Sequence, residues 1–155
     1  MRYQTLIPVL LAALLAFSGC KEIKDPEFRR LEHFGVKNMN LNEATIGFGV
    51  TYFNPNNFGL SVKEAEANVY LDSVYIGRFV QDSLIEVQKN SEFTVPFSGA
   101  VSLQTALKLN LNDLVNKQVM VKADGTVKVG KAGIYVSKAV HYQGLHRLEE
   151  LNLKF

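Results

Sequence analysis

The stretch VTYFNPNNFGLSV, residues 50–62, contains one strand that ends at a cluster of turn residues and a second strand that begins after it. Val50 and Tyr52 share one face of the first strand, because side chains alternate along a strand. Pro55 has no backbone N–H and cannot continue a central sheet ladder. The pattern therefore predicts two strands joined by a polar turn.

The asparagines of this stretch have a structural explanation. The side chains of Asn54, Asn56 and Asn57 can hydrogen-bond to nearby backbone groups, and asparagine, like Gly59, tolerates the left-handed backbone conformation. We interpret residues 54–57 as the exit from one strand and the entry to the next, without a chemical role.

Alternation of apolar and polar residues continues along the chain from residue 44 onward. Each run then has one apolar face and one wetter face, which is typical of half-buried antiparallel strands. Turn residues at 54–57, 72–73, 89–91 and 130–133 separate the runs. Short strands with such turns predict an all-β sandwich or barrel.

One segment departs from this rhythm. In residues 102–117, Leu103, Leu107, Leu111 and Leu114 recur every three or four residues, which predicts a short helix or two helical turns at one end of the sheets. Asn110 or Asn112 could cap its last turn.

The first nineteen residues resemble a secretory signal. Arg2 is their only charge, a twelve-residue apolar run spans residues 6–17, and Ser18 and Gly19 are small. The run is shorter than the roughly 20 residues that a membrane-spanning helix needs. We expect residues 1–19 to be cleaved.

Cys20 is the only cysteine of the chain, so no intramolecular disulfide can form. The sequence FSGC at residues 17–20 resembles the bacterial lipobox, although leucine is commoner where Phe17 stands. The resemblance implies cleavage after Gly19 and lipid attachment at Cys20. Each buried methylene contributes about 0.8 kcal/mol, so several acyl chains would anchor the protein stably to a membrane.

The charges exclude one class of partner. Residues 20–155 carry 16 basic and 15 acidic side chains, a net charge of +1, which gives no electrostatic footprint for nucleic acid. Residues 20–31 mix both signs and contain one proline, which predicts a lipidated tether. Residues 32–155 are long enough for a single domain.

No motif indicates catalysis, a cofactor or a metal. His141 and His146 are five residues apart, which does not match a metal pair, and one cysteine cannot build a thiolate-rich zinc site. His33 is isolated in sequence. We place the carboxylates on solvated faces: Glu64, Glu66, Glu149 and Glu150. We therefore expect no enzyme activity, no cofactor and no metal.

Two groups of aromatic and apolar residues are candidates for exposed surfaces. An exposed patch for a protein or lipid could include Tyr70, Tyr75, Phe79 and Tyr142, although packing within the sheet is the favoured use. The final residues alternate Leu151, Leu153 and Phe155, which predicts an edge strand or a segment lying over the sheets rather than a membrane barrel.

The motifs together resemble the late embryogenesis abundant type 2 family, also described as the water stress and hypersensitive response domain. The similarity spans about residues 34–143 and includes Asn-Pro-Asn at 54–56, the hairpin at 69–77, VPF at 95–97 and the closing hairpin at 123–136. It implies a small antiparallel β-sandwich of fibronectin type III or immunoglobulin-like form, with about seven strands and one helix. The predicted core residues are Ile46, Phe48, Val50, Val69, Leu71, Val95, Phe97, Val121 and Val127.

The resemblance also implies a part in tolerance of desiccation or other stress. We expect a non-catalytic lipoprotein of the cell envelope, anchored through Cys20 to a bacterial membrane. The outer membrane is favoured, and the protein could lie on its periplasmic side or at the cell surface. Envelope proteins or lipid headgroups are the expected partners. The alternative is a carrier or accessory subunit that binds a hydrophobic small molecule in an apolar cavity of about 300 Å³ or more within the sandwich.

Overall fold

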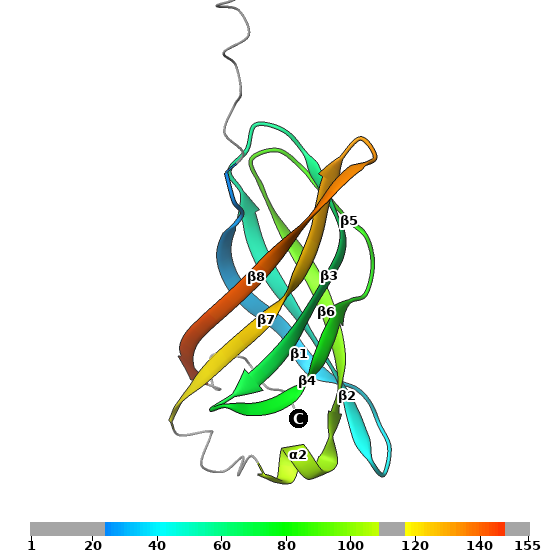
Figure 1. Ribbon diagram of the computed structural model, residues 1–155, viewed down its shortest axis with the longest axis vertical. Helices are drawn as coiled ribbons and strands as arrows, with labels where there is room; N and C mark the ends of the chain where they lie inside the picture. Colours follow the sequence, from blue (N-terminus) through cyan, green and yellow to red (C-terminus); the bar gives the residue numbers. More distant parts are fainter. Residues whose placement is uncertain (1–23, 109–116, 148–155) are drawn as a thin grey trace, which may run out of the picture.

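A computed structural model describes residues 24–108 and 117–147 of the chain (Figure 1). Eight strands and one short helix are formed by these residues. In chain order they are β1 (Glu27–Met39), β2 (Glu43–Asn54), β3 (Leu60–Leu71), β4 (Val74–Gln81), β5 (Ile85–Val87), β6 (Ser91–Ser102), α2 (Leu103–Lys108), β7 (Gln118–Lys131) and β8 (Ile134–Arg147). The all-β class with one helix is as predicted. The predicted helix cap at Asn110 or Asn112 lies outside the described residues.

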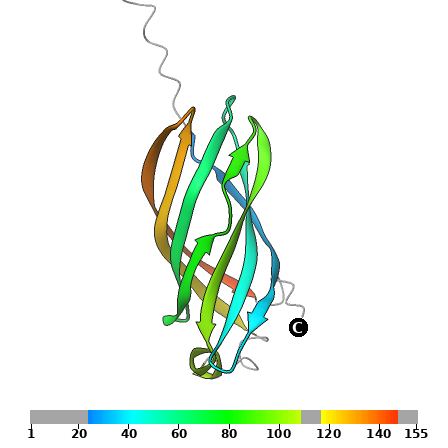
Figure 2. The ribbon, with the colours of Figure 1, turned by 90° about the vertical axis from the view of Figure 1, so that its right-hand side faces the viewer.

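The strands form one antiparallel sheet in the order β1-β2-β6-β4-β3-β7-β8, with β5 paired to β3. The sequence predicts two facing sheets, but β4 bonds both to β3, through residues 66–71 of that strand, and to β6. This strand therefore joins what would otherwise be separate sheets. Figure 2 shows the resulting curled sheet, which closes partway into a barrel.

The inner face of the curled sheet carries the core in two clusters. One contains Ile76, Phe79, Val101 and Val119, and the other contains Val62, Val87, Phe93 and Val95. Of the predicted core residues, Val50 and Val95 are buried. Six more are partly buried against the clusters: Ile46, Phe48, Val69, Leu71, Phe97 and Val127. Val121 is also partly buried. The alternation thus identified the inner face correctly. Val119, which belongs to the same apolar alternation but is not among the predicted core residues, is fully buried.

The predicted turns lie where the strands end. Asp72 and Ser73 have φ angles of 44° and 71°, and Ala132 and Gly133 have 52° and 86°. Two consecutive residues with positive φ form the tight hairpin turn whose twist matches that of the flanking strands. By contrast, residues 54–59 have no positive φ angle. The left-handed conformation therefore does not explain the asparagines of this stretch.

The first strand begins earlier than the sequence suggests. The sequence predicts that residues 27–31 belong to the tether, but in the structure they form the start of β1, which pairs with β2 from Glu27 onward. The curl brings β1 and β8, the two edges of the sheet, to the same side of the molecule (Figure 1). The rings of Phe28 and Tyr142 meet across this seam, with centroids 6.1 Å apart.

Candidate functional site

The Asn-Pro-Asn motif forms a buried hydrogen-bond network at one end of the sheet. Asn54 is fully buried, and its amide donates to the carbonyl oxygens of Phe58 (3.0 Å) and Gln88 (2.9 Å). Its Oδ1 accepts from the backbone and side-chain nitrogens of Asn56, at 3.1 and 2.9 Å. These bonds satisfy a side chain that would otherwise be costly to bury. The motif is structural, as the sequence predicts.

The same network holds the N-terminal segment in place. Asn56 accepts a hydrogen bond from the backbone nitrogen of Lys24 (2.9 Å) and donates one to its carbonyl oxygen (2.7 Å). Its own carbonyl oxygen accepts from the backbone nitrogen of Asn90 (3.0 Å). The chain therefore enters the domain at a fixed point, beside the β2–β3 and β5–β6 turns. The sequence offered no sign that Asn56 and Lys24 meet.

Strand β1 is held to the sheet by polar side chains that cross over β2. Gly47 and Gly49 lie on the outer face of β2, where a side-chain carbon at Gly47 would collide with the Lys37 side chain. The Lys37 ammonium reaches across to Ser98 Oγ and Asp82 Oδ2, both at 2.6 Å. The two glycines at outer positions of β2 thus leave room for side chains from the edge strand.

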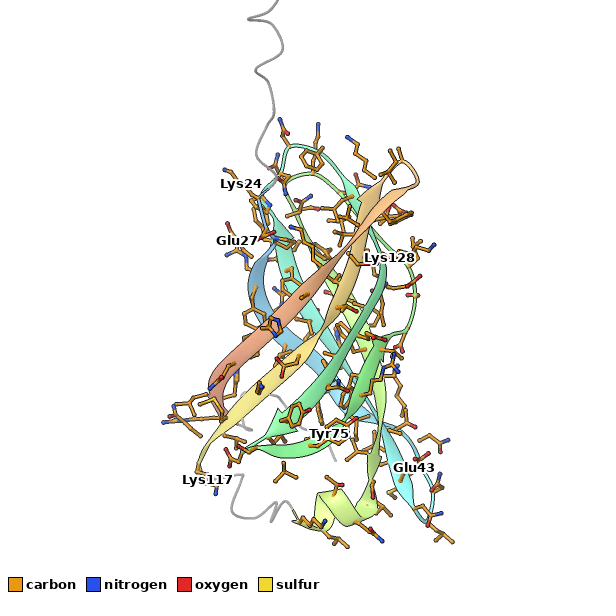
Figure 3. All side chains as sticks on the ribbon, viewed as in Figure 1. Lys24, Glu27, Glu43, Tyr75, Lys117 and Lys128 are labelled. Carbon is orange, nitrogen blue, oxygen red and sulfur yellow. The ribbon has the colours of Figure 1, made fainter. Side chains whose placement is uncertain are left out.

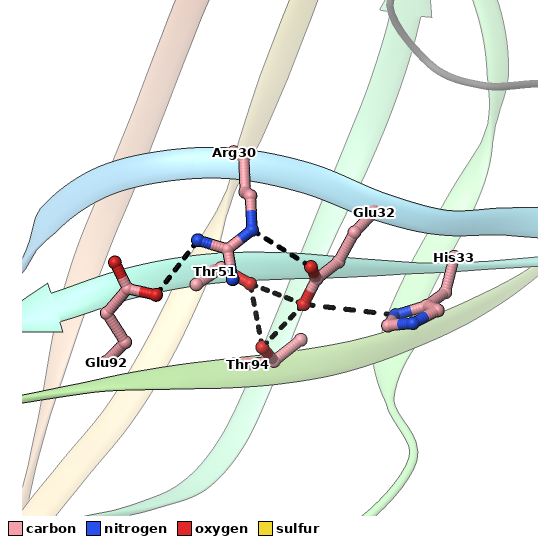
Figure 4. Close-up of polar contacts among 6 residues, drawn as sticks. All are labelled: Arg30, Glu32, His33, Thr51, Glu92 and Thr94. Atoms are coloured by element: carbon pink, nitrogen blue, oxygen red, sulfur yellow. Dashed lines mark hydrogen bonds and ion pairs between the residues drawn. The ribbon is translucent and has the colours of Figure 1, made fainter.

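Glu32 makes the second of these crossings (Figure 4). Its Oε1 accepts hydrogen bonds from the hydroxyl groups of Thr51 (2.7 Å) and Thr94 (2.8 Å), and its Oε2 accepts from Arg30 Nε (3.0 Å). Arg30 also donates to Glu92 (2.9 Å). The hydrogen bonds from Thr51 and Thr94, with that from Arg30, lower the pKa of Glu32 from 4.5 to about 2. These contacts join β1 to β2 and β6, so the cluster stabilises the edge of the sheet.

The Glu32 cluster predicts a specific dependence of stability on pH. A carboxyl group whose pKa is lowered in the folded state contributes stability above its unfolded pKa, and this is lost as the pH falls through the folded pKa. The difference in unfolding free energy between the wild type and Glu32→Gln should therefore shrink between pH 4.5 and about 2. Because solvent screens this partly exposed group, we expect a difference of about 1–2 kcal/mol at neutral pH.

Urea unfolding followed by circular dichroism across this pH range would measure the effect. Glu43→Gln is the control, because that exposed side chain makes no hydrogen bond among the described residues and should leave the pH profile unchanged. A wild-type-to-Glu32→Gln difference that is constant with pH would contradict the proposed role of the carboxylate.

Apolar side chains are exposed along the seam between β1 and β8. Val136, Val140 and Tyr142 pair with inward-facing residues of β7. Val136 is 55% exposed and Val140 is 37% exposed, while Phe28 on β1 is 43% exposed. The inner face of β8 is therefore only partly covered. This was not anticipated, because alternation in the sequence does not show which apolar face finds a partner.

An open surface pocket of about 350 Å³ lies over β3, β4, β7 and β8, and most of its lining residues are charged or polar. It is lined by Lys63, Glu64, Ala65, Glu66, Val80, Gln81, Thr126, Lys128 and Ser137. Three of its four charged residues are paired, since Lys128 lies 3.7 Å from Glu64 and Arg78 pairs with Glu66. This lining differs from the apolar cavity that the carrier alternative requires.

The three histidines do not come together. His33 is exposed near Glu32, whereas His141 contacts Asp124 (2.9 Å) and His146 contacts Tyr142. Within residues 24–108 and 117–147, no three His, Cys, Asp or Glu side chains are grouped to hold a metal ion.

The four aromatic residues of the less favoured patch hypothesis do not form one surface. Phe79 is buried, Tyr70 and Tyr75 pack on each other, and Tyr142 lies on β8. Glu149, Glu150, Leu151, Leu153 and Phe155 lie outside the described residues, as does Cys20. No helix in the described part of the chain is long and apolar enough to cross a membrane.

These features define a small all-β domain in which one curled antiparallel sheet is closed at one end by a buried asparagine network. Solved structures share this fold. A solution structure of a protein from Arabidopsis thaliana matches with a TM-score of 0.53 and 12% identity, covering 89% of each chain. A crystal structure of a protein from Archaeoglobus fulgidus matches with a TM-score of 0.51 and 9% identity, covering 78% of this chain and 97% of that one.

The chain belongs to the family described as late embryogenesis abundant protein, which matches residues 50–142. The matched region begins at the strand before the Asn-Pro-Asn motif and ends within β8. This confirms the resemblance seen in the sequence. The family is associated with water stress, and its members are generally not enzymes. No curated protein matches the chain in sequence.

Proposed function

We propose that this protein is a non-catalytic lipoprotein of the bacterial cell envelope that protects the cell during drying or osmotic stress. The observation that carries the proposal is the family membership of residues 50–142. The signal-like residues 1–19 and the lipobox-like sequence ending at Cys20 add the location. The outer membrane is the favoured site, on its periplasmic side or at the cell surface.

The structure is compatible with a protein that acts by contact rather than by chemistry. Its charged side chains form ion pairs on the outer face, such as Arg78 with Glu66 and Lys122 with Asp124. Such a surface remains well hydrated and offers loops and strand edges to other envelope proteins or to lipid headgroups.

Cys20→Ser provides the test of the anchor and of the function together. Without lipid, the protein should move from the membrane fraction to the soluble fraction, because the acyl chains on Cys20 are the proposed anchor. Mass spectrometry of the wild type should show residues 20–155 plus acyl chains. A Ser18→Ala variant, which keeps a small residue before the cysteine, should stay in the membrane fraction.

Deletion of the gene tests stress protection. A strain lacking the gene should survive drying or osmotic shock less well than the wild type, and should grow normally in ordinary medium. Complementation with the wild-type gene should restore survival. Normal membrane retention of Cys20→Ser would contradict the anchor, and unchanged survival of the deletion strain would contradict the protective role.

One observation favours the carrier as a second candidate. The inward-facing Val136 and Val140 and the neighbouring Phe28 expose apolar surface along the seam, which a hydrophobic small molecule would cover. Unchanged survival of the deletion strain, together with a defined lipid that co-purifies with the wild-type protein, would favour this candidate over stress protection.

A further inference from the structure

Three turns gather at the end of the sheet where the N-terminal segment enters (Figures 1 and 2). They are the β2–β3 turn (residues 55–59), the β5–β6 turn (88–90) and the β7–β8 turn (132–133). We call this surface, with Lys24 and the flanking Lys131 and Ile134, the entry end. Hydrogen bonds from Asn56 to Lys24, and from Asn90 to Asn56, hold two of the turns and the entering chain together.

The entry end carries positive charge without matching negative charge. Lys24, Lys89 and Lys131 are exposed, and the three turns contain no acidic residue. Among the described residues, these three ammonium groups make no ion pair. The nearby Asp25 is engaged by Lys138 (3.0 Å) and Glu27 by Arg29 (3.1 Å).

An apolar side chain stands beside these lysines. Ile134, next to the β7–β8 turn, is 78% exposed. The Lys131 ammonium lies 5.1 Å from the centre of the Phe58 ring, which places an aromatic side chain at the same surface. Lysine beside exposed apolar side chains is the composition of surfaces that lie in a membrane interface.

The opposite end of the sheet differs. It carries charges of both signs: Glu43 after the β1–β2 turn and Asp72 in the β3–β4 turn, with Lys108 at the end of α2 and Lys117 just before β7 (Figure 3). Figure 3 shows Lys24 and Glu43 at the two ends of the molecule. A negatively charged surface would therefore attract the entry end more than the opposite end.

The tether is too short to hold the entry end far from its anchor. Three residues lie between Cys20 and Lys24, and the four residue steps span at most about 14 Å at ~3.3–3.6 Å per residue. That is comparable with the Debye length of ~8–10 Å at physiological salt, so lysines at the entry end would experience the potential of a charged membrane.

We propose that the entry end lies on anionic lipid headgroups, with the ammonium groups of Lys24, Lys89 and Lys131 against lipid phosphates and Ile134 in the interfacial layer. This inference rests on the proposed lipid attachment at Cys20. It adds a fixed orientation of the domain relative to the membrane, which an acyl anchor alone does not impose. The seam and the opposite end of the sheet then remain accessible to the aqueous side.

A single-tryptophan experiment tests this orientation, because the natural chain has no tryptophan. Residues 20–155 carrying Ile134→Trp are coupled through the Cys20 thiol to a maleimide lipid in vesicles of phosphatidylcholine and phosphatidylglycerol. Brominated lipids should quench the indole emission strongly. The matched variant Leu41→Trp places the indole in the β1–β2 turn, where the natural side chain is 95% exposed, and it should not be quenched.

Charge variants separate electrostatic contact from simple proximity. The double variant Lys89→Gln, Lys131→Gln should reduce the equilibrium constant for contact between the entry end and the vesicle surface about 30-fold. The reason is that each lysine near an anionic surface contributes ~1 kcal/mol. Lys108→Gln with Lys117→Gln, which removes the same charge elsewhere, should have little effect. Quenching of Ile134→Trp should also fall on pure phosphatidylcholine vesicles.

Equal quenching of the Ile134→Trp and Leu41→Trp indoles, or none at either position, would overturn the proposed orientation. Quenching that is unaffected by Lys89→Gln with Lys131→Gln would overturn the electrostatic contact. Chemical coupling makes these results independent of whether cells attach lipid to Cys20. A failure of the anchor in cells is therefore distinguishable from a failure of the orientation.

Discussion

Asn54→Ala is expected to lower the free energy of unfolding by about 3–4 kcal/mol. Alanine removes both donors to the carbonyl oxygens of Phe58 and Gln88 and the acceptor for two nitrogens of Asn56. Each buried polar group left without a partner costs about 1–3 kcal/mol, and water entering the space would relieve part of this cost. Urea unfolding of residues 20–155 with Cys20→Ser, followed by circular dichroism, measures the change.

The neighbouring Asn57 provides the control for this prediction. It is exposed and its side chain makes no hydrogen bond among the described residues, so Asn57→Ala should change stability by less than about 0.5 kcal/mol. Equal stabilities of the Asn54→Ala and Asn57→Ala proteins would mean that the buried network does not stabilise the fold.

Phe79→Ala is expected to destabilise the protein by a similar or larger amount, about 3–5 kcal/mol. Phe79 is 3% exposed at the centre of one core cluster, and its ring lies 5.1 Å from that of Phe48, centroid to centroid. Its ring also lies against the backbone of Gly99 on β6, where a side-chain carbon would approach it to 2.7 Å. Truncation would leave a cavity that the two surrounding strands cannot close.

Val80→Ala tests whether the face assignment of β4 is correct. Val80 is adjacent in sequence, points to the outer face and is 43% exposed, so its truncation should cost less than about 1 kcal/mol. A larger loss for Val80→Ala than for Phe79→Ala, measured by the same unfolding experiment, would show that the inner and outer faces are reversed.

Much of the local structure was predictable because it depends on neighbouring residues. The alternation of Ile46, Phe48 and Val50 identifies a strand and its inner face, since side chains of a strand point to opposite sides. Asp72-Ser73 and the glycine-containing segment at 130–133 identify turns from their own conformational preferences. The lipobox-like residues ending at Cys20 predict an anchor from an equally local pattern.

The candidate site could be predicted only in part. Asn54 was correctly interpreted as structural, but the reason is buried hydrogen bonding rather than a left-handed backbone. The Glu32 cluster was missed because its partners Thr51 and Thr94 lie 19 and 62 residues away in sequence. Gly47 and Gly49 were the only local signal, and their meaning depends on the side chains that cross them.

The sequence by itself determined that this chain forms antiparallel strands with one apolar face, which turns join them, and to which family it belongs. The tertiary structure alone decided that β4 joins all the strands into one curled sheet, that Lys24 is bound by Asn56, and that the inner face of β8 stays partly exposed. The physical reason is the distance along the chain between the interacting residues. Alternation follows from the geometry of each strand alone. The pairing order of the strands follows from contacts between residues far apart in the chain, and no local pattern specifies which strands will pair.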